Sequence, residues 1–373
     1  MKNRLLTRPR FILICVILGV WATLNFTHTD YYSIEQGSAT PLAPNLTVTG
    51  LPSDAPETGL VARRPGFFLV DVRLEQMSLG RWLRARVLGG IEYVPISALV
   101  PSGTTVSDFD RSGYIDMENA KQEASYVAFR ATGLPVSRRN DGAVVVARRI
   151  GSPATKAKIR VGDRIVGVNG VSTPTRCDVV RALHNIAPRT KISVRVEPAK
   201  ISSAGVVVMQ PPISVPVTTA PPRRTWVSDC PGTVGKAHSL IGVALDTATS
   251  YALPATVTID TQYVGGPSGG LAMALAIYDR VTTGRLTGRH RVAVTGTISA
   301  NGRVGEIGGI AQKARAAVTA HADIFLVPSS QAGEARAAIN GELRVVGVST
   351  FDEALHALRR LGGDRPVLRG NQN

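Results

Sequence analysis

The chain has 373 residues, 44% of them hydrophobic and 19% charged, a balance that supports ordinary globular cores and excludes disorder throughout. The formal net charge is +16, and because lysine supplies only 8 of the 43 basic residues, arginine supplies 35. An arginine excess of this kind reflects either a GC-rich genome or a basic surface held near a polyanion such as anionic lipid. The sequence has no lysine-rich run, RNA-binding aromatic signature, zinc-finger spacing or other metal-ligand motif, so we expect no nucleic-acid partner, no metal and no cofactor.

The N-terminus predicts a membrane signal-anchor. Residues 1–10 carry four basic side chains, and residues 11–26 are an uncharged and mainly apolar run. The run is short for the ~20 residues that span a bilayer, but no small-x-small cleavage signal follows it, which favours an uncleaved anchor over a cleaved signal peptide. We therefore expect a single-pass transmembrane helix at 11–26, with residues 1–10 in the cytoplasm and the rest of the chain on the extracytoplasmic side.

The next two segments contain no recognisable catalytic or ligand-binding motif. Residues 27–64 are rich in Thr, Ser, Pro and Gly and are interpreted as an irregular stalk. Residues 65–135 are interpreted as an N-terminal α/β segment, with a strand at 66–73 and a helix at 117–132 that Asp116 could cap.

Residues 136–200 contain a more specific pattern. An apolar strand at 142–146 precedes the sequence GSPA and then GDRIVGVNG, whose Asn169-Gly170 pair is a strong turn signal between strands. A short helix at 177–186 and a strand at 191–196 follow. This order resembles a bacterial PDZ domain, a small β-rich fold, and the resemblance implies capture of an extended peptide or a C-terminus by strand addition. The backbone at Gly142, Ala143 and Val144 is the expected peptide cradle, although the same residues also fit a plain core strand.

The remaining chain divides into a linker and a third unit. Residues 201–228 contain two Pro-Pro pairs among valines and threonines and are interpreted as a partly extended linker. Residues 229–365 form the third unit. Cys177 and Cys230 could form one disulfide, but no disulfide framework is implied.

The third unit places a serine at a glycine-rich turn. A strand at 255–264 ends at two glycines, and an apolar helix at 271–281 follows, so Ser268 lies at the N-terminus of that helix. Unpaired backbone amides and the positive end of the helix dipole meet there, and a developing oxyanion needs such donors. Gly269 and Gly270 are the candidate oxyanion positions. The alternative is a serine that only caps the helix.

A lysine on a later helix is the candidate base. Lys313 shares the apolar face of a helix at 310–322 with small alanines, and burial there would lower its pKa and favour the neutral amine. Thr295, in a strand at 291–298, could hydrogen-bond and orient that amine. Taken alone, Lys313 also fits a snorkelling lysine at the edge of a core, and Thr295 fits a residue with simple β-propensity.

Together these motifs resemble the proteolytic domain of the Lon family. The segments GGPSGG and VTGTISANGRVGEIGGIAQKARAA resemble the family's PSAG serine motif, its TGE-type strand and its GGxxxK lysine motif, over roughly residues 238–335. The resemblance implies an α/β (α+β) fold, with Ser268 as nucleophile, Lys313 as general base and Thr295 as the residue that orients the amine. The chain departs from the family at Gly269, where alanine is usual, and at Thr297, which replaces the glutamate.

The anchor, the PDZ unit and the Lon-like unit together resemble membrane-anchored, PDZ-containing Lon-like serine peptidases of bacteria. No GxxxxGK[ST] nucleotide-binding motif occurs, so the resemblance implies an ATP-independent endopeptidase of exported or cell-envelope proteins at the bacterial cell membrane. Proteins and peptides are the expected substrates, the membrane is contacted through residues 11–26, and homo-oligomerisation is left open.

Two other functions fit parts of the sequence. The segment GPSGG also satisfies the GxSxG elbow of α/β-hydrolases, with Asp323 or Asp352 and then His356 following in the expected order. Against this esterase function, Pro267 fits a strained elbow poorly and no HGGG-type loop precedes it. The second alternative is a non-catalytic membrane tether, in which the PDZ unit recruits exported proteins and the Lon-like unit only assembles.

Overall fold

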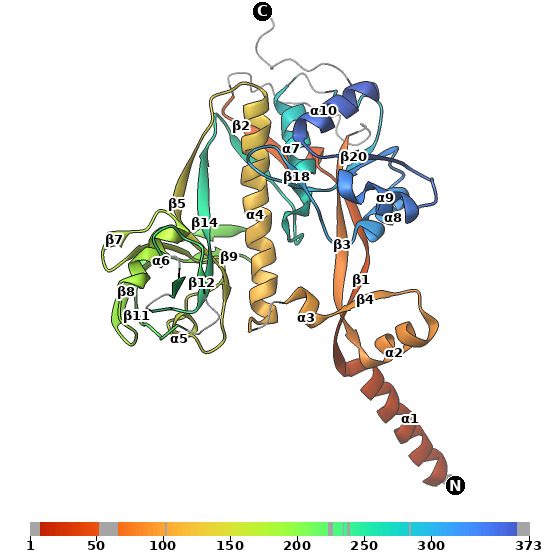
Figure 1. Ribbon diagram of the computed structural model, residues 1–373. Coiled ribbons are helices and arrows are strands. Elements are labelled where there is room, and N and C mark those ends of the chain that lie inside the picture. The colour runs from red at the N-terminus through yellow and green to blue at the C-terminus, as the bar shows by residue number, and fades with distance from the viewer. Residues whose placement is uncertain are drawn as a thin grey trace, which may run out of the picture.

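The computed structural model describes residues 8–51, 66–100, 103–222, 227–233, 235–236, 239–282 and 285–363. These residues form two bodies with one long helix, α4 (Val106–Ala131), between them. In Figure 1 the smaller β-rich body lies to the left of α4, and a larger body with a central sheet lies to the right.

The larger body is built on a mixed sheet of six strands. Its order is β20-β19-β16-β3-β1-β4, where β3, β16, β19 and β20 run parallel and β1 is antiparallel to both of its neighbours. The strands are β1 (His28–Pro41), β3 (Phe67–Ser78), β4 (Glu92–Pro95), β16 (Val292–Val294), β19 (Ile324–Pro328) and β20 (Arg344–Val348). All five residues of β19 are buried, as expected for an inner parallel strand covered on both faces.

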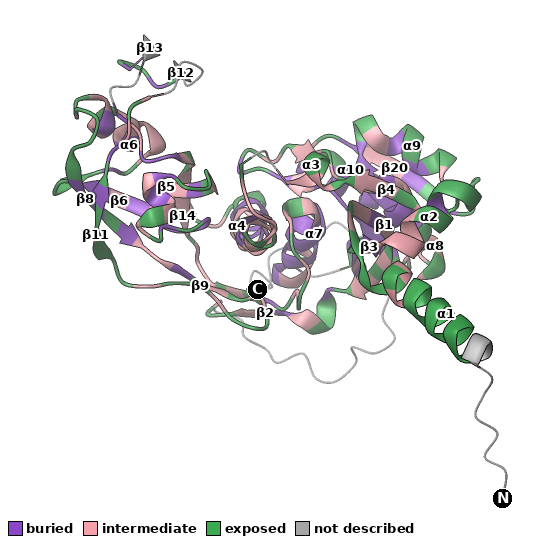
Figure 2. Cartoon of the chain, turned by 90° about the horizontal axis from the view of Figure 1, so that it is seen from below, coloured by how far each residue is buried: buried purple, intermediate pink, exposed green. Residues whose placement is uncertain are grey.

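Helices cover both faces of this sheet. One core cluster joins α4, α7 (Gly270–Val281) and α10 (Phe351–Arg360) to one face through Leu69, Val294 and Leu326. A second cluster joins α8 (Ile310–Thr319) and α9 (Ala332–Ala337) to the other face through Val70, Ala293 and Phe325. Because neighbouring residues of a strand point to opposite faces, the same strands supply both cores. Figure 2 shows α7 buried along most of its length.

The interpretation of residues 27–64 as a stalk is wrong for the described part. His28–Pro41 is the strand β1, which pairs with β3 along nearly its whole length. Leu46–Thr49 is the strand β2, which pairs with β15 (Thr256–Ile259). The threonine- and serine-rich composition suits a strand because β-branched residues pack well on a pleated sheet, while Leu42 and Leu46 are buried in the core. Residues 52–64 lie outside the described part of the chain.

The strand and helix expected in residues 65–135 are confirmed, but this segment is not a separate unit. β3 is an inner strand of the large sheet, so it shares one core with residues far along the chain. The helix α4 begins at Val106, well before the expected residue 117, and its N-cap is Thr105 rather than Asp116. Two shorter helices, α2 (Leu79–Leu88) and α3 (Ile96–Leu99), flank β4.

The smaller body contains the sheet β11-β8-β6-β5-β14, with β7 paired to β6. Its strands are β5 (Ser137–Arg148), β6 (Arg164–Val168), β7 (Val171–Ser172), β8 (Lys191–Glu197), β11 (Ile213–Thr218) and β14 (Val243–Ala252), and its helices are α5 (Pro153–Lys156) and α6 (Arg176–His184). The expected turn is confirmed, with φ of 49° at Asn169 and 81° at Gly170.

The linker expected at 201–228 is wrong over most of its described part. Ala199–Ile201 (β9) and Val207–Met209 (β10) form a hairpin, and β11 completes the small sheet. Proline is tolerated at position 216 because β11 is an edge strand, where a missing amide breaks no inner ladder. Cys177 and Cys230 form the disulfide that the sequence allowed.

The small body is inserted into the large one. The chain leaves α4 through β5 and returns through β14, and these two antiparallel strands form a ribbon between the bodies. The domain boundary expected at residue 229 is therefore wrong, because β14 (Val243–Ala252) still belongs to the small sheet. The large body is made of residues on both sides of the insertion.

The helix α1 (Arg8–Phe26) packs on α2 and also contacts β3, and most of its residues from 11 to 26 are exposed. The apolar run at 11–24 is about 21 Å long as a helix at ~1.5 Å per residue, short of the ~30 Å hydrocarbon core. The transmembrane helix expected at 11–26 is not found: within the described chain, no helix combines the length and the apolarity needed to cross a bilayer.

Candidate active site

Ser268 lies on a tight turn that precedes a buried helix. Pro267–Gly269 form one 3-10 turn and α7 begins at Gly270. Gly266, with φ of 85°, turns the chain into it, a conformation that favours glycine. Gly266 also donates its amide to the carbonyl of Gly113 on α4 at 2.7 Å. The turn is thus held by a hydrogen bond to α4 as well as by the conformation of its own glycine.

The backbone of Ser268 is held by the end of β16. Its carbonyl accepts the Gly296 amide at 2.8 Å and the Thr295 hydroxyl at 3.3 Å. The Gly296 carbonyl in turn accepts the Leu271 amide at 3.0 Å. Residues 295 and 296 follow the carboxyl end of a parallel strand, the edge at which open α/β sheets usually place their sites.

Lys313 reaches Ser268 from the opposite face of the sheet. α8 begins after Gly309, whose left-handed conformation (φ 67°, ψ 38°) turns the chain into the helix. The Lys313 side chain is 2% exposed, and its Nζ lies 2.7 Å from Ser268 Oγ and 3.3 Å from Thr295 Oγ1. The structure therefore brings together the serine, the lysine and the threonine that the sequence analysis singled out.

Burial changes the protonation of this amine. It lowers the pKa of Lys313 to about 8, and the nearby Asp71 carboxylate opposes the shift by favouring the ammonium. Asp71 is itself held by Ser38, whose amide and hydroxyl both donate to it at 2.7 Å. At pH 7 about a tenth of the amines would be neutral, against about one in a few thousand for a free lysine.

The two candidate oxyanion glycines differ. The Gly270 amide donates to the Pro267 carbonyl, so it is engaged within the turn. Gly269 is buried inside the same 3-10 turn. A Cβ on Gly269 would lie 2.6 Å from Leu69 Cδ1, so an alanine there requires the end of the Leu69 side chain to shift. Both glycines therefore stay candidates for the oxyanion donor.

The peptide cradle expected at Gly142, Ala143 and Val144 is wrong. These residues lie in β5, and Ala143 and Val144 pair with β6 on one side and with β14 on the other. A strand paired on both sides has no free backbone edge for an incoming peptide. Among the described strands, β14 forms the edge of this sheet next to β5 and lies beside α6, while β11 forms the other edge.

The alternative hydrolase triad does not form. His356 is exposed on α10, and Asp323 accepts the Arg291 amide at 2.7 Å. No hydrogen bond joins either residue to Ser268 in the described chain. The side chain that contacts the Ser268 hydroxyl is an amine and not an imidazole.

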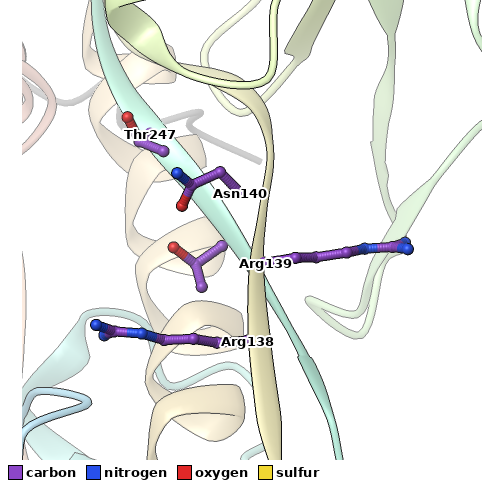
Figure 3. Close-up of a pocket in the computed structure, with 5 residues that line it drawn as sticks. Arg138, Arg139, Asn140 and Thr247 are labelled. Atoms are coloured by element: carbon purple, nitrogen blue, oxygen red, sulfur yellow. The ribbon is translucent and has the colours of Figure 1, made fainter.

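A polar hollow of about 550 Å³ lies elsewhere, on the β5–β14 ribbon. It is lined by Arg138, Arg139, Asn140, Thr247 and Thr249. Figure 3 shows the Arg138 and Arg139 side chains pointing to opposite sides of the strand, so the two guanidinium groups do not converge on one ligand. None of the lining residues belongs to the Ser268 site.

The family comparison agrees with this geometry. Residues 261–360 match the Lon protease (S16) C-terminal proteolytic domain, and residues 144–198 match the PDZ domain. This chain carries a Lon-type proteolytic domain and a PDZ domain. The Lon-type match begins just before the nucleophile turn and ends with α10, so it covers the part of the large body that follows the PDZ insertion.

Individual relatives match a third of this chain or less, and the chain spans less than a fifth of their length. The chain is 39% identical over 93 residues to Lon protease of Neorickettsia sennetsu, 35% over 123 residues to Lon protease of Chloroflexus aurantiacus, and 35% over 92 residues to Lon protease 2 of Bacillus subtilis. These matches cover 24%, 32% and 25% of this chain but only 11%, 14% and 16% of the relatives.

A solved PDZ domain, from the SdrC-like protein of Listeria monocytogenes, is similar over 28% of this chain and 87% of its own. Its sequence identity is 12% and its TM-score is 0.21, too low to support an argument.

Two contributors to the site gave no signal in the sequence analysis. Gly113 lies inside the long helix α4 and acts through its backbone carbonyl. Asp71 lies in the expected strand at 66–73, where a single acidic residue looks like an ordinary solvated position. Only three-dimensional proximity connects either residue with Ser268 or Lys313.

Proposed function

We propose that this protein is an ATP-independent serine endopeptidase that uses Ser268 and Lys313 as a catalytic dyad. The observation that carries the proposal is the 2.7 Å separation of Lys313 Nζ and Ser268 Oγ, with the lysine side chain 2% exposed. A neutral amine at this distance can accept the hydroxyl proton directly. The match to a Lon-type proteolytic domain supports hydrolysis of peptide bonds.

The proposed mechanism has two halves. Neutral Lys313 takes the Ser268 proton while Oγ attacks the scissile carbonyl carbon, and a backbone amide of the turn, at Gly269 or Gly270, stabilises the resulting oxyanion. The Lys313 ammonium then gives its proton to the departing amine, which leaves an acyl-enzyme ester. In the second half Lys313 takes a proton from water, the hydroxide attacks the ester, and the ammonium returns the proton to Ser268.

Thr295 has an orienting role in this mechanism. Its hydroxyl donates a hydrogen bond to the Ser268 carbonyl, so its oxygen can accept a hydrogen bond from Lys313 Nζ. The threonine therefore fixes the amine relative to the backbone that carries the nucleophile. It does not itself exchange a proton with substrate.

We further propose that the PDZ domain binds substrate as an added strand on β14. The free edge of β14 beside α6 supplies the backbone groups, while β5 is already paired on both sides. Strand addition takes its affinity from main-chain hydrogen bonds and its selectivity from alternate side chains. Extended segments or C-termini of proteins are the proposed ligands.

The proposed location of both domains is the extracytoplasmic side, where exported and cell-envelope proteins are the available substrates. The support is the Cys177–Cys230 disulfide, since structural disulfides persist in oxidising compartments. ATP independence fits this location, and the chain itself contains no GxxxxGK[ST] motif.

The test is hydrolysis of casein and of a fluorogenic peptide without nucleotide. We expect activity in the wild type, its loss in Ser268→Ala and in Lys313→Met, and its retention in His356→Ala. Loss in His356→Ala with retention in Lys313→Met would instead favour the esterase mechanism. Wild-type hydrolysis no faster than that of Ser268→Ala would reject the peptidase function and leave the non-catalytic tether.

A further inference from the structure

The N-terminal part of α4 contacts both bodies of the molecule. On the PDZ side, Arg111 donates Nε to the Val161 carbonyl and Nη2 to the Ala199 carbonyl, and its Nη2 lies 3.5 Å from Asp163 Oδ1. The side chains of Arg111 and Asp163 are 15% and 6% exposed, so the pair is largely removed from water. Asp163 also accepts the amides of Arg160 and Ala199, at 2.8 and 3.0 Å, which fixes its carboxylate.

A second pair runs in the opposite direction. Arg148 on β5 donates Nε to both carboxylate oxygens of Asp108 on α4, at 3.0 and 3.1 Å, and Nη1 to the Ile159 carbonyl at 3.2 Å. An arginine of α4 thus pairs with an aspartate of the PDZ domain, and an arginine of the PDZ domain pairs with an aspartate of α4. We refer to Arg111–Asp163 and Asp108–Arg148 as the crossed ion pairs. Directional bonds from Asp108 and Arg111, which lie one turn apart on the same face of the helix, fix the rotation and the height of α4 on the PDZ domain.

The same turns of α4 hold the nucleophile on another side. The Gly113 carbonyl accepts the Gly266 amide at 2.7 Å. A Cβ on Gly265 would lie 3.3 to 3.4 Å from three backbone atoms of Gly113, so the two backbones are in close contact. Ser268 follows Gly266 by two residues, and Gly113 follows Arg111 by two. A shift of α4 on the PDZ domain therefore acts on the serine turn directly.

We propose that Arg111 and Asp108 are positioning residues for Ser268: the crossed ion pairs lock α4 to the PDZ domain, and Gly113 passes this placement to the turn that bears the nucleophile. The inference rests on the proposed peptidase function for its kinetic effect. It gives the PDZ domain a part in catalysis that does not depend on a peptide bound to it.

Ionic contacts suit this role better than apolar ones. A buried ion pair is weak evidence of stability, because the desolvation of two charges offsets their attraction. What it supplies is one preferred geometry, since the bonds are lost when the partners rotate or slide. Misplacement of reacting groups by about 1 Å can lower a rate by about 100-fold, so a small loss of register at Gly113 is enough to be measured.

The experiment compares full-length variants on a fluorogenic peptide too short to reach the PDZ domain. Arg111→Gln and Asp108→Asn each remove one crossed pair. The exchanged variant Asp108→Arg/Arg148→Asp restores a pair of opposite polarity. Arg164→Gln is the matched control, because Arg164 is an equally buried arginine that pairs with Asp141 and Glu197 inside the PDZ domain without contacting α4.

We expect kcat to fall by about 10-fold or more in Arg111→Gln and Asp108→Asn, with KM within about 2-fold of the wild type. The exchanged variant recovers part of this loss, and Arg164→Gln keeps the wild-type kcat. Unchanged kcat in Arg111→Gln, or an equal fall in Arg164→Gln, overturns the inference.

Hydrogen exchange separates this inference from the peptidase function. The fragment that covers residues 261–270 should exchange faster in Arg111→Gln than in the wild type, because the Gly266 amide loses its fixed acceptor. Arg164→Gln should leave that exchange unchanged. This readout applies even if the wild type hydrolyses no peptide, and unaltered exchange in Arg111→Gln rejects the coupling whatever the activity.

Discussion

At the residue scale, the central property of the molecule is that the Lys313 amine is buried away from solvent beside the Ser268 hydroxyl. The Lys313 amine is enclosed by α8 and the sheet and has two hydroxyl neighbours, those of Ser268 and Thr295. Its nearest influential charge is the Asp71 carboxylate, which favours the ammonium and so limits how far the pKa falls. In the proposed mechanism, the balance of burial against this carboxylate sets the pH at which Lys313 becomes neutral.

The pH dependence of hydrolysis follows from this balance. Because burial lowers the pKa of Lys313 to about 8, kcat/KM should rise as the pH passes through about 8 and then level off. Asp71→Asn removes the opposing charge, so the lysine pKa falls further and the rise moves to lower pH. The measurement is kcat/KM between pH 6 and 10 in both proteins, and a rise in Asp71→Asn at the same or a higher pH would contradict the argument.

The same burial costs stability at neutral pH. The folded pKa of Lys313, about 8, lies below the ordinary lysine pKa of 10.5, so the unfolded state binds more protons between these limits and stability rises with pH there. Below pH 8 the folded state bears the full cost, about 3 kcal/mol. Lys313→Met should therefore be inactive yet more stable than the wild type at pH 7, with the difference shrinking toward pH 10. Urea denaturation at both pH values checks this, and a variant less stable than the wild type would refute it.

Thr295 should matter through its hydroxyl alone. Thr295→Val keeps the shape of the fully buried side chain but removes both hydrogen bonds, to Lys313 and to the Ser268 carbonyl. We expect kcat to fall by about 10-fold, the effect of losing one bond to a charged group. Thr295→Ser keeps the hydroxyl and should retain most of the activity. Equal kcat values for the two variants would show that the hydroxyl has no orienting role.

At the scale of elements, the site depends on two helices that begin on opposite faces of one sheet. α7 starts at the nucleophile turn and α8 carries the base, and both approach the end of β16. Since β16 continues into Thr295 and Gly296, the sheet places the two helices relative to each other. Close backbone contact at the start of α7 leaves little room for this helix to shift relative to the sheet.

Substitution of Gly269 or Gly270 tests how little space the start of α7 leaves for a side chain. A Cβ on Gly270 would lie 2.9 Å from the backbone nitrogen of Ile298, whereas a Cβ on Gly269 would meet the side-chain end of Leu69. Backbone cannot move aside as a side chain can, so Gly270→Ala should lower the melting temperature more than Gly269→Ala. Leu69→Val should rescue Gly269→Ala and not Gly270→Ala. Thermal unfolding of the single and double variants decides, and rescue of both by Leu69→Val would contradict the steric argument.

The sequence predicted the local elements around the site better than their assembly. The glycine turn, the apolar helix after it and the helix with Lys313 are local patterns, and the structure confirms all three. The sequence of β1 predicts a stalk because its polar residues and threonines are typical of a loop, and only the pairing with β3 makes it a strand. The sequence predicts the PDZ cradle on β5 because nothing local shows that β14, about 100 residues later in the chain, pairs with it.

At the scale of the whole molecule, the PDZ domain is an insertion in the Lon-type body and not a separate domain that precedes it in the chain. Two strands, β5 and β14, connect the bodies, and the crossed ion pairs fix one against the other. Residues 28–131 supply three strands of the large sheet and the helix α4, although the Lon-type match begins only at residue 261. The catalytic body therefore needs chain from both sides of the insertion.

The disulfide belongs to the PDZ domain alone, which permits a test of how far the two bodies are independent. Cys177 lies in the first turn of α6 and is joined to Cys230, 53 residues later, and beside it Arg176 pairs with Asp229 at 2.8 Å. Closing a loop of that length stabilises a fold by about 4 kcal/mol in the chain-entropy description. Cys177→Ser/Cys230→Ser should therefore weaken the packing of α6 beside β14, the edge proposed to bind peptide.

The expected result is a split between two activities. The double serine variant should lose affinity for a PDZ-binding peptide by about 10-fold or more, since disorder in α6 must be reversed on binding. Hydrolysis of a short fluorogenic peptide should stay near the wild-type rate, because the PDZ residues of the crossed ion pairs are Asp163, just before β6, and Arg148, at the end of β5, and neither belongs to α6. Arg181→Gln, which removes an exposed ion pair with Asp178 on the same helix, is the control and should leave both activities unchanged. A parallel loss of binding and hydrolysis would mean that α6 supports the nucleophile turn as well, and that the two bodies cannot be separated at β5.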